Sequence, residues 1–332
     1  MARRPLLVFA GQSNMMGAAV YPQSEQFVFE NSFEYLHKPI RMGNPAGEFK
    51  KYGFPSGEFS YIDIKTAYGD ITMPFFKSSL ADFEKNTYFC PSMANLDSDE
   101  EKTVKRFNSF SEKTATMGTC LAPFIVKALE ENGFPSCYAH IAKGGVPIKY
   151  FTVGGASDYF DHKVTDFFRE SAKKFSEDDT SDRILLWLQG ESDANNSDAY
   201  THYLNTLEVL WQKAKRLGFT MFLIIRVGYF GIKSISEIMR AQEDFCARTE
   251  NAHIITRALS YFNHPTLKED GWFKSPPTEE YRDCRDSFFG FGNNHVNEKG
   301  FRVISEHAVP NIIRILNGEN PILESENIIP LL

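Results

Sequence analysis

The sequence lacks an apolar stretch long enough to span a bilayer, which takes about 20 predominantly apolar residues. Its first residues, Met1-Ala2-Arg3-Arg4, carry the positive charge of a signal peptide. The apolar run behind them, residues 5–10, is shorter than the apolar core of such a peptide and leads directly into the serine motif described below. Cleavage would remove that motif, so we expect a cytoplasmic protein.

Paired cysteines are also absent. The number of cysteines is odd, they are scattered along the chain, and no C-x-x-C sequence occurs. This spacing argues against a disulfide framework and against a zinc knuckle. The five cysteines are Cys90, Cys120, Cys137, Cys246 and Cys284.

The chain has no excess of positive charge. Its formal net charge is −7, with a pI of about 5.7, so nothing electrostatic favours binding to nucleic acid or to an anionic membrane. Internal repeats and low-complexity tracts are absent, and 42% hydrophobic with 24% charged residues is typical of a soluble globular protein. The 30 Phe and 14 Tyr must largely serve the core, although a surplus would also suit stacking on sugar rings.

What is present is an alternation of short apolar runs with amphipathic segments. The runs are nearly continuous, as in parallel strands covered on both faces. The segments between them have helical periodicity, and two of them stop at Gly133 and near Gly218, as helices do. We therefore predict a doubly wound α/β fold. The predicted strands are residues 6–10, 137–142, 184–188, 221–227 and 253–256, and the predicted helices are 121–132, 199–216, 234–249 and 301–316.

Two stretches interrupt this alternation. Residues 21–116 are rich in Phe, Tyr, Ser, Lys and Glu with many Gly and Pro, and residues 263–294 are similarly irregular. Long loops in compact domains are often functional. We interpret the chain as a single domain, residues 1–332, in which residues 21–116 form an insertion that covers or borders the site.

Three polar motifs stand where chemistry is expected, at the carboxyl ends of predicted strands or before the last helix. Gly11-Gln12-Ser13-Asn14-Met15 follows the first strand and makes Ser13 a candidate nucleophile; its plainer interpretation is a helix cap. Gln189-Gly190-Glu191-Ser192-Asp193 offers Gln189 as an oxyanion donor, with Asp193 expected to cap the next helix. His295 precedes the last helix and is a candidate general base.

Together these motifs resemble the SGNH hydrolase superfamily, above all its branch of sialate O-acetylesterase-like proteins and acetylxylan esterases, carbohydrate esterase family six. Two further segments fit, in family order: Met117-Gly118-Thr119-Cys120-Leu121-Ala122, and Ala142-Lys143-Gly144-Gly145-Val146-Pro147-Ile148. The resemblance implies a flavodoxin-like three-layer α/β/α sandwich with a central parallel sheet. It also implies acyl transfer through Ser13, with His295 as base and no metal or organic cofactor.

The resemblance assigns the oxyanion hole to the N–H groups of Ser13 and Gly118 and to the side chain of Gln189. Gln12, Asn14 and Gly145 are further candidates for support of the site. The implied substrate is an acetylated carbohydrate, such as a sialic acid-like sugar, a nucleotide sugar or a glycan. The oligomeric state is not indicated.

The chain departs from the family at one position. The family usually has an Asp three residues before the catalytic His, and here that residue is Gly292. The protein could work with a Ser–His dyad, or another carboxylate could serve, with Glu191 or Asp286 as candidates. Alternatively the site is degenerate and the protein binds glycans without turnover. An acyltransferase that passes the acyl group to a sugar or amine is a further alternative to the esterase.

Overall fold

The computed structural model describes residues 3–16, 29–36, 48–50, 121–142, 145–153, 155–228, 235–260, 262, 295–296 and 298–324. Within these ranges, seven strands form one sheet in the order β3-β2-β4-β1-β5-β6-β7. All neighbouring strands are parallel except the edge pair β2 and β3. The strands are β1 (Leu6–Gly11), β2 (Phe33–Leu36), β3 (Glu48–Lys50), β4 (Cys137–Ala142), β5 (Arg183–Leu188), β6 (Met221–Ile225) and β7 (Ala252–Thr256).

The central strands are buried on both faces, as their continuous apolar sequences predict. Every residue of β1 and β4 is buried, and so are all residues of β5 except Arg183. The β6 strand ends two residues earlier than its sequence suggests. The Arg226 N–H still donates to Thr256 of β7, at 3.1 Å, but the Val227 N–H is bound by the side chain of Gln242, at 3.0 Å.

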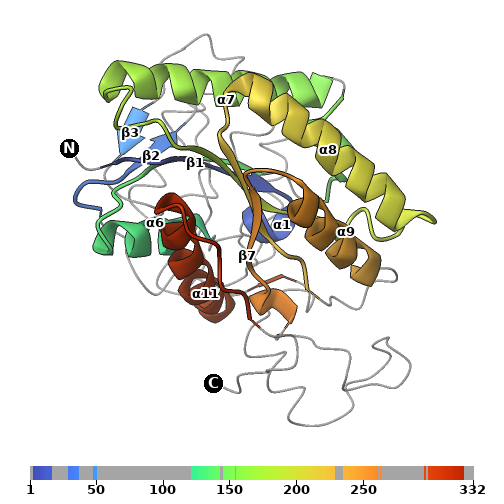
Figure 1. Cartoon of the computed structure of the whole chain (residues 1–332). Helices are drawn as coiled ribbons and strands as arrows, with labels where there is room; N and C mark the ends of the chain where they lie inside the picture. The colour runs from blue at the N-terminus through green and yellow to red at the C-terminus, as the bar shows by residue number, and fades with distance from the viewer. Residues whose placement is uncertain are drawn as a thin grey trace, which may run out of the picture.

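Helices cover both faces of this sheet, which makes the predicted three-layer α/β/α sandwich. Figure 1 shows α7, α8 and α9 over one face and α6 and α11 over the other. The helices are α1 (Ser13–Met16), α6 (Ala122–Glu131), α7 (Gly155–Lys174), α8 (Ala199–Leu217), α9 (Ile235–Arg248) and α11 (Glu298–Leu316), with 3-10 turns η2 (Ile148–Phe151) and η3 (Ala258–Ser260).

The strand order confirms the flavodoxin-like arrangement. Numbered along the chain, the five strands β4-β1-β5-β6-β7 have the order 2-1-3-4-5. The two remaining strands, β2 and β3, extend the β4 edge, and both come from the segment predicted as an insertion. Part of that segment therefore enlarges the sheet, and most of the rest of residues 21–116 lies outside the described residues.

One long helix was not predicted from the sequence. The α7 helix carries Phe160, Val164, Phe167 and Phe168, which are spaced for one helical face, and all four are buried. None of the helices in the described part of the chain is both long and apolar enough to cross a membrane.

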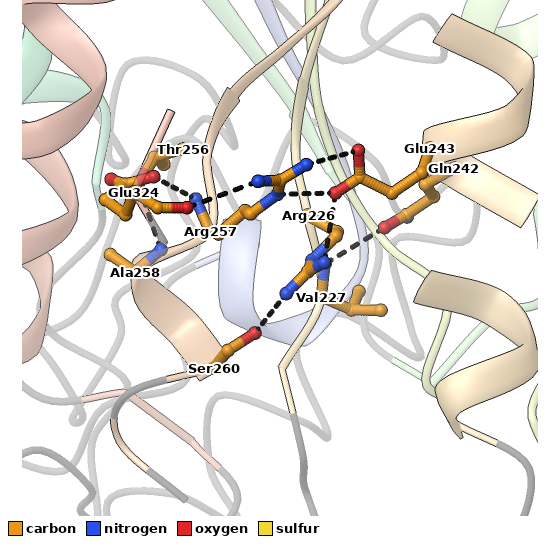
Figure 2. A network of polar contacts seen from close by, with 9 residues as sticks. All are labelled: Arg226, Val227, Gln242, Glu243, Thr256, Arg257, Ala258, Ser260 and Glu324. Carbon is orange, nitrogen blue, oxygen red and sulfur yellow. Dashed lines mark hydrogen bonds and ion pairs between the residues drawn. The ribbon is translucent and has the colours of Figure 1, made fainter. Parts of the chain in front are cut away.

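A polar network joins the carboxyl ends of β6 and β7 to α9 and to the end of the described chain (Figure 2). Glu243 of α9 accepts hydrogen bonds from Arg226 and, at two atoms, from Arg257. The Glu324 carboxylate accepts from Thr256 and from the Arg257 backbone N–H. These bonds hold α9 and the segment around Glu324 against the carboxyl ends of β6 and β7.

Candidate functional site

The candidate site lies at the carboxyl ends of β4, β1 and β5, which end side by side. Gly11, the last residue of β1, is in register with Ala142 of β4 and with Leu188 of β5. In the sheet, β4 lies on one side of β1 and β5 on the other, so the strand order reverses here. Such a switch point is where open α/β sheets bind ligands.

Ser13 is presented by a turn that only glycine allows. Gly11 has φ +147°, and a Cβ on it would lie 2.0 Å from the carbonyl oxygen of Leu188. The Gln12 N–H donates to that same oxygen at 3.1 Å. Ser13 then begins α1 and is half-buried, whereas Gln12 and Asn14 on either side are buried. Of these three residues, Ser13 is the most exposed to solvent.

Gln12 connects the serine motif to the loop after β5. Its Oε1 accepts a hydrogen bond from Gln189 Nε2 and another from the Ser192 N–H, each 3.2 Å long. The first and second sequence motifs, about 180 residues apart, are therefore in direct contact. Gln12 is buried and holds the two loops together through these bonds.

Gln189 is fully buried, and its amide faces inward. Besides Gln12, its Nε2 donates to Asp193 Oδ2 at 2.6 Å and to the Val146 carbonyl oxygen at 3.2 Å. In this arrangement the amide donates to internal acceptors, so a role as oxyanion donor requires it to exchange a partner. That role stays a prediction, and the bonds assign Gln189 to holding the loops together.

Asp193 does not cap a helix, contrary to the sequence interpretation. The segment after β5 is a series of turns, and α8 begins only at Ala199. Asp193 is buried, and its Oδ2 also accepts from the Ile148 N–H, at 2.8 Å, in the loop after β4. Burial raises the pKa of this carboxyl, although the bonds from Gln189 and Ile148 act against the rise. Gly145, with φ +69°, forms the turn that begins this loop.

Asn14 bridges the second and third motifs. Its Nδ2 donates to Glu191 Oε1 at 2.8 Å, and its Oδ1 accepts from the Val296 N–H at 3.0 Å. Because Val296 follows His295, the bridge brings the candidate base to the helix turn that carries Ser13. His295 is half-buried there.

Glu191 is anchored by Asn14 and is buried. Burial raises the pKa of its carboxyl above the ordinary value, even though the Asn14 bond acts to lower it. No residue in the described ranges gives a hydrogen bond to its second oxygen, Oε2. A direct triad bond from Glu191 to His295 is therefore not made in this arrangement, and a catalytic role for Glu191 stays a prediction.

The sequence interpretation missed the layer behind the site. The Tyr203 hydroxyl of α8 donates to the Gln189 carbonyl oxygen at 2.6 Å, and Gln242 of α9 donates to the same oxygen at 2.9 Å. Trp187 Nε1 donates to the Tyr203 hydroxyl at 3.2 Å. Tyr203 lies within the predicted helix 199–216, and its helical spacing in the sequence gives no sign of this bond.

Three predicted positions, Gly118, Asp286 and Gly292, lie outside the described residues. Within the described ranges, no group of three or more His, Cys, Asp or Glu side chains could hold a metal ion. A separate open groove, lined by Glu208 and Trp211 of α8 and Arg248 of α9, lies at the amino ends of β6 and β7. It is at the opposite end of the sheet from Ser13 and is not part of the site.

Comparisons with known proteins find likeness in structure only. No family model matches the chain, and no curated protein does. A protein from Arabidopsis thaliana matches with a TM-score of 0.50 and 13% identity over 94% of this chain and 98% of its own. NanS matches with a TM-score of 0.51 and 12% identity over 96% of this chain and 99% of its own.

A protein described as a novel carbohydrate acetylesterase from Xanthomonas citri also matches, with a TM-score of 0.43 and 13% identity over 95% of this chain and 57% of its own. Identities this low speak to architecture and not to activity. The chain thus shares the three-layer α/β fold of the Arabidopsis protein and of NanS.

Proposed function

We propose that this protein is a serine esterase that removes O-acetyl groups from a carbohydrate. The observation that carries the proposal is the hydrogen bond from the Val296 N–H to Asn14. It joins the residue after His295 to the residue after Ser13, so the segments that carry the proposed base and the proposed nucleophile are bonded to each other at the carboxyl ends of the strands. A Ser next to a base in an accessible position is the arrangement that nucleophilic catalysis needs.

In the proposed reaction, Ser13 Oγ attacks the acetyl carbonyl carbon and His295 accepts the hydroxyl proton. The tetrahedral oxyanion is held by the N–H groups of Ser13 and Gly118. The intermediate then collapses, the sugar oxygen leaves with the proton from His295, and acetyl-Ser13 remains. Water, deprotonated by His295, attacks the acetyl group and releases acetate and free Ser13.

The substrate class follows from the motif resemblance, which favours acetyl groups on sugars.

Covalent labelling tests the chemistry before the sugar is known. A fluorophosphonate probe should label the wild-type protein on the peptide that contains Ser13, and Ser13→Ala should prevent labelling. Release of acetate from O-acetylated sialic acids, nucleotide sugars and xylo-oligosaccharides then identifies the substrate. Labelling together with acetyl transfer to an added sugar or amine, in place of acetate release, would indicate an acyltransferase.

One observation favours a second candidate, a glycan-binding protein without turnover. Gly292 replaces the usual Asp, and Glu191 bonds to Asn14 rather than completing a triad. This candidate predicts saturable binding of a sugar without any labelling of Ser13. Labelling at Ser13 together with acetate release would exclude it.

A further inference from the structure

Between residues that the structure describes, Asn14 makes two hydrogen bonds whose directions are fixed by chemistry. The Val296 N–H can only donate, so the atom facing it must be Asn14 Oδ1. Asn14 Nδ2 therefore faces Glu191, and Glu191 Oε1 must accept. Asn14, Val296 and Glu191 are all buried, which keeps water from competing for these bonds.

The position of this bridge matters because Gly292 stands three residues before His295, where the family that the motifs resemble usually has an Asp. In a triad, a carboxylate orients the imidazole through a bond to the ring. Here Asn14 binds the backbone next to His295, while Glu191 binds Asn14. Ser13 directly precedes Asn14 in the chain. The Asn14 side chain therefore holds the turn that carries Ser13 against the segment that carries His295.

We propose that Asn14, anchored by Glu191, is a positioning residue that holds His295 in reach of Ser13. The inference rests on the proposed function, because it assumes that Ser13 and His295 carry out acyl transfer. In it Glu191 acts as a hydrogen-bond acceptor for Asn14 and not as a partner of the imidazole. Asn14 and Glu191 then fix the position of the segment that carries His295.

Four variants separate this role from a merely structural one: Asn14→Ala, Asn14→Asp, Glu191→Ala and Glu191→Gln. The matched control is Asn311→Ala. Asn311 is equally buried, and its amide donates to the carbonyl oxygens of Ile255 and Ile322 and accepts from the Ile322 N–H, with no bond to the site motifs among those described. Each protein is assayed for p-nitrophenyl acetate hydrolysis from pH 5 to 9, with melting temperature recorded.

A displacement of about 1 Å in a catalytic group can reduce turnover about 100-fold. We therefore expect Asn14→Ala to lower kcat about 100-fold with KM within about threefold. Asn311→Ala should lower the melting temperature with kcat within about threefold. Glu191→Gln keeps an acceptor for Asn14 Nδ2, and its kcat should exceed that of Glu191→Ala at least about tenfold.

Asn14→Asp gives a signature that a structural defect would not. In this variant a carboxyl oxygen replaces Asn14 Nδ2 and faces Glu191 Oε1. Two carboxyl oxygens form a hydrogen bond only while one of the two groups is protonated. The ratio of Asn14→Asp to wild-type kcat should therefore fall as pH rises. A general loss of structure would leave that ratio independent of pH.

The inference is overturned if Asn14→Ala has the same kcat as Asn311→Ala, or if Glu191→Gln is as slow as Glu191→Ala. The first result would mean that the Asn14 side chain only stabilises the fold. The second would mean that the charge of Glu191, and not its hydrogen bond to Asn14, is what catalysis requires. Ser13→Ala and His295→Ala run alongside. If these two hydrolyse as fast as wild type, the proposed function itself fails, and the positioning role fails with it.

Discussion

At the residue scale, the position of Ser13 depends on a single backbone conformation. Gly11 ends β1 at φ +147°, with its α-carbon packed against the Leu188 carbonyl group. Any side chain there would be strained in its backbone and would collide with the next strand. The sequence pattern of an apolar run followed by Gly-Gln-Ser predicted this turn correctly, because strand and glycine are both local signals.

Gly11→Ala should lower the free energy of unfolding by about 2–5 kcal/mol, the sum of backbone strain and steric overlap. Denaturant unfolding measures the loss. Gly133→Ala is the matched control, because Gly133 also has positive φ, +86°, but has nothing within 4 Å of an added Cβ. It should lose about 1–2 kcal/mol. Equal losses at the two positions would show that the contact with Leu188 does not limit residue 11.

Glu191 makes stability depend on pH in a predictable direction. Its folded-state pKa is raised by burial, so the folded protein holds this proton more tightly than the unfolded chain does. The contribution to stability is full below the unfolded pKa of about 4.3 and is lost as pH rises through the folded pKa. At pH values above the folded pKa the buried carboxylate is ionised, and it lowers the free energy of unfolding by an amount that no longer changes with pH.

Glu191→Gln cannot ionise and escapes this loss. The free energy of unfolding of wild type minus that of Glu191→Gln should therefore decrease as pH rises from about 4.3, as measured by urea unfolding at several pH values. Glu306→Gln on α11 is a control at a position exposed to solvent. A difference that increases with pH would mean that Glu191 is stabilised as the carboxylate.

At the element scale, the five strands of the flavodoxin-like core were predictable from sequence, and so were the stops of α6 and α8 near Gly133 and Gly218. These features are local, because each depends on a run of apolar residues and one turn residue. The short strand β2 was not predicted, since it has four residues with Glu34 among them. Its pairing with β4 is a long-range contact, which a single sequence does not display.

The network of Figure 2 makes one element depend on another, because Glu243 of α9 faces guanidinium groups beside two strands. Glu243→Gln should lower the free energy of unfolding by about 2 kcal/mol, since it removes the carboxylate that pairs with the largely buried Arg226. Glu208→Gln is the comparison, because Glu208 pairs with Arg248 where both are about half exposed. That change should cost less than about 1 kcal/mol, measured in the same denaturant series. Equal losses in the free energy of unfolding for the two variants would mean that the Figure 2 network does not stabilise the packing of α9 against the sheet.

At the scale of the whole molecule, the site is assembled from segments that are far apart in the chain. Motif order predicted that Ser13, Gln189, Glu191 and His295 belong together, and the bonds through Gln12 and Asn14 do connect their segments. The orientation of Gln189 and the contact of Asp193 with Ile148 could not be predicted. Both depend on which buried donors and acceptors the neighbouring loops supply, and that is a property of the folded chain.

The most direct test of the esterase claim compares p-nitrophenyl acetate hydrolysis by wild type, Ser13→Ala and His295→Ala under identical conditions. If Ser13 and His295 act together as nucleophile and base, wild type turns over and each variant loses at least about 100-fold in kcat/KM. Equal rates for all three proteins would contradict it, because the ester would then be hydrolysed without either residue.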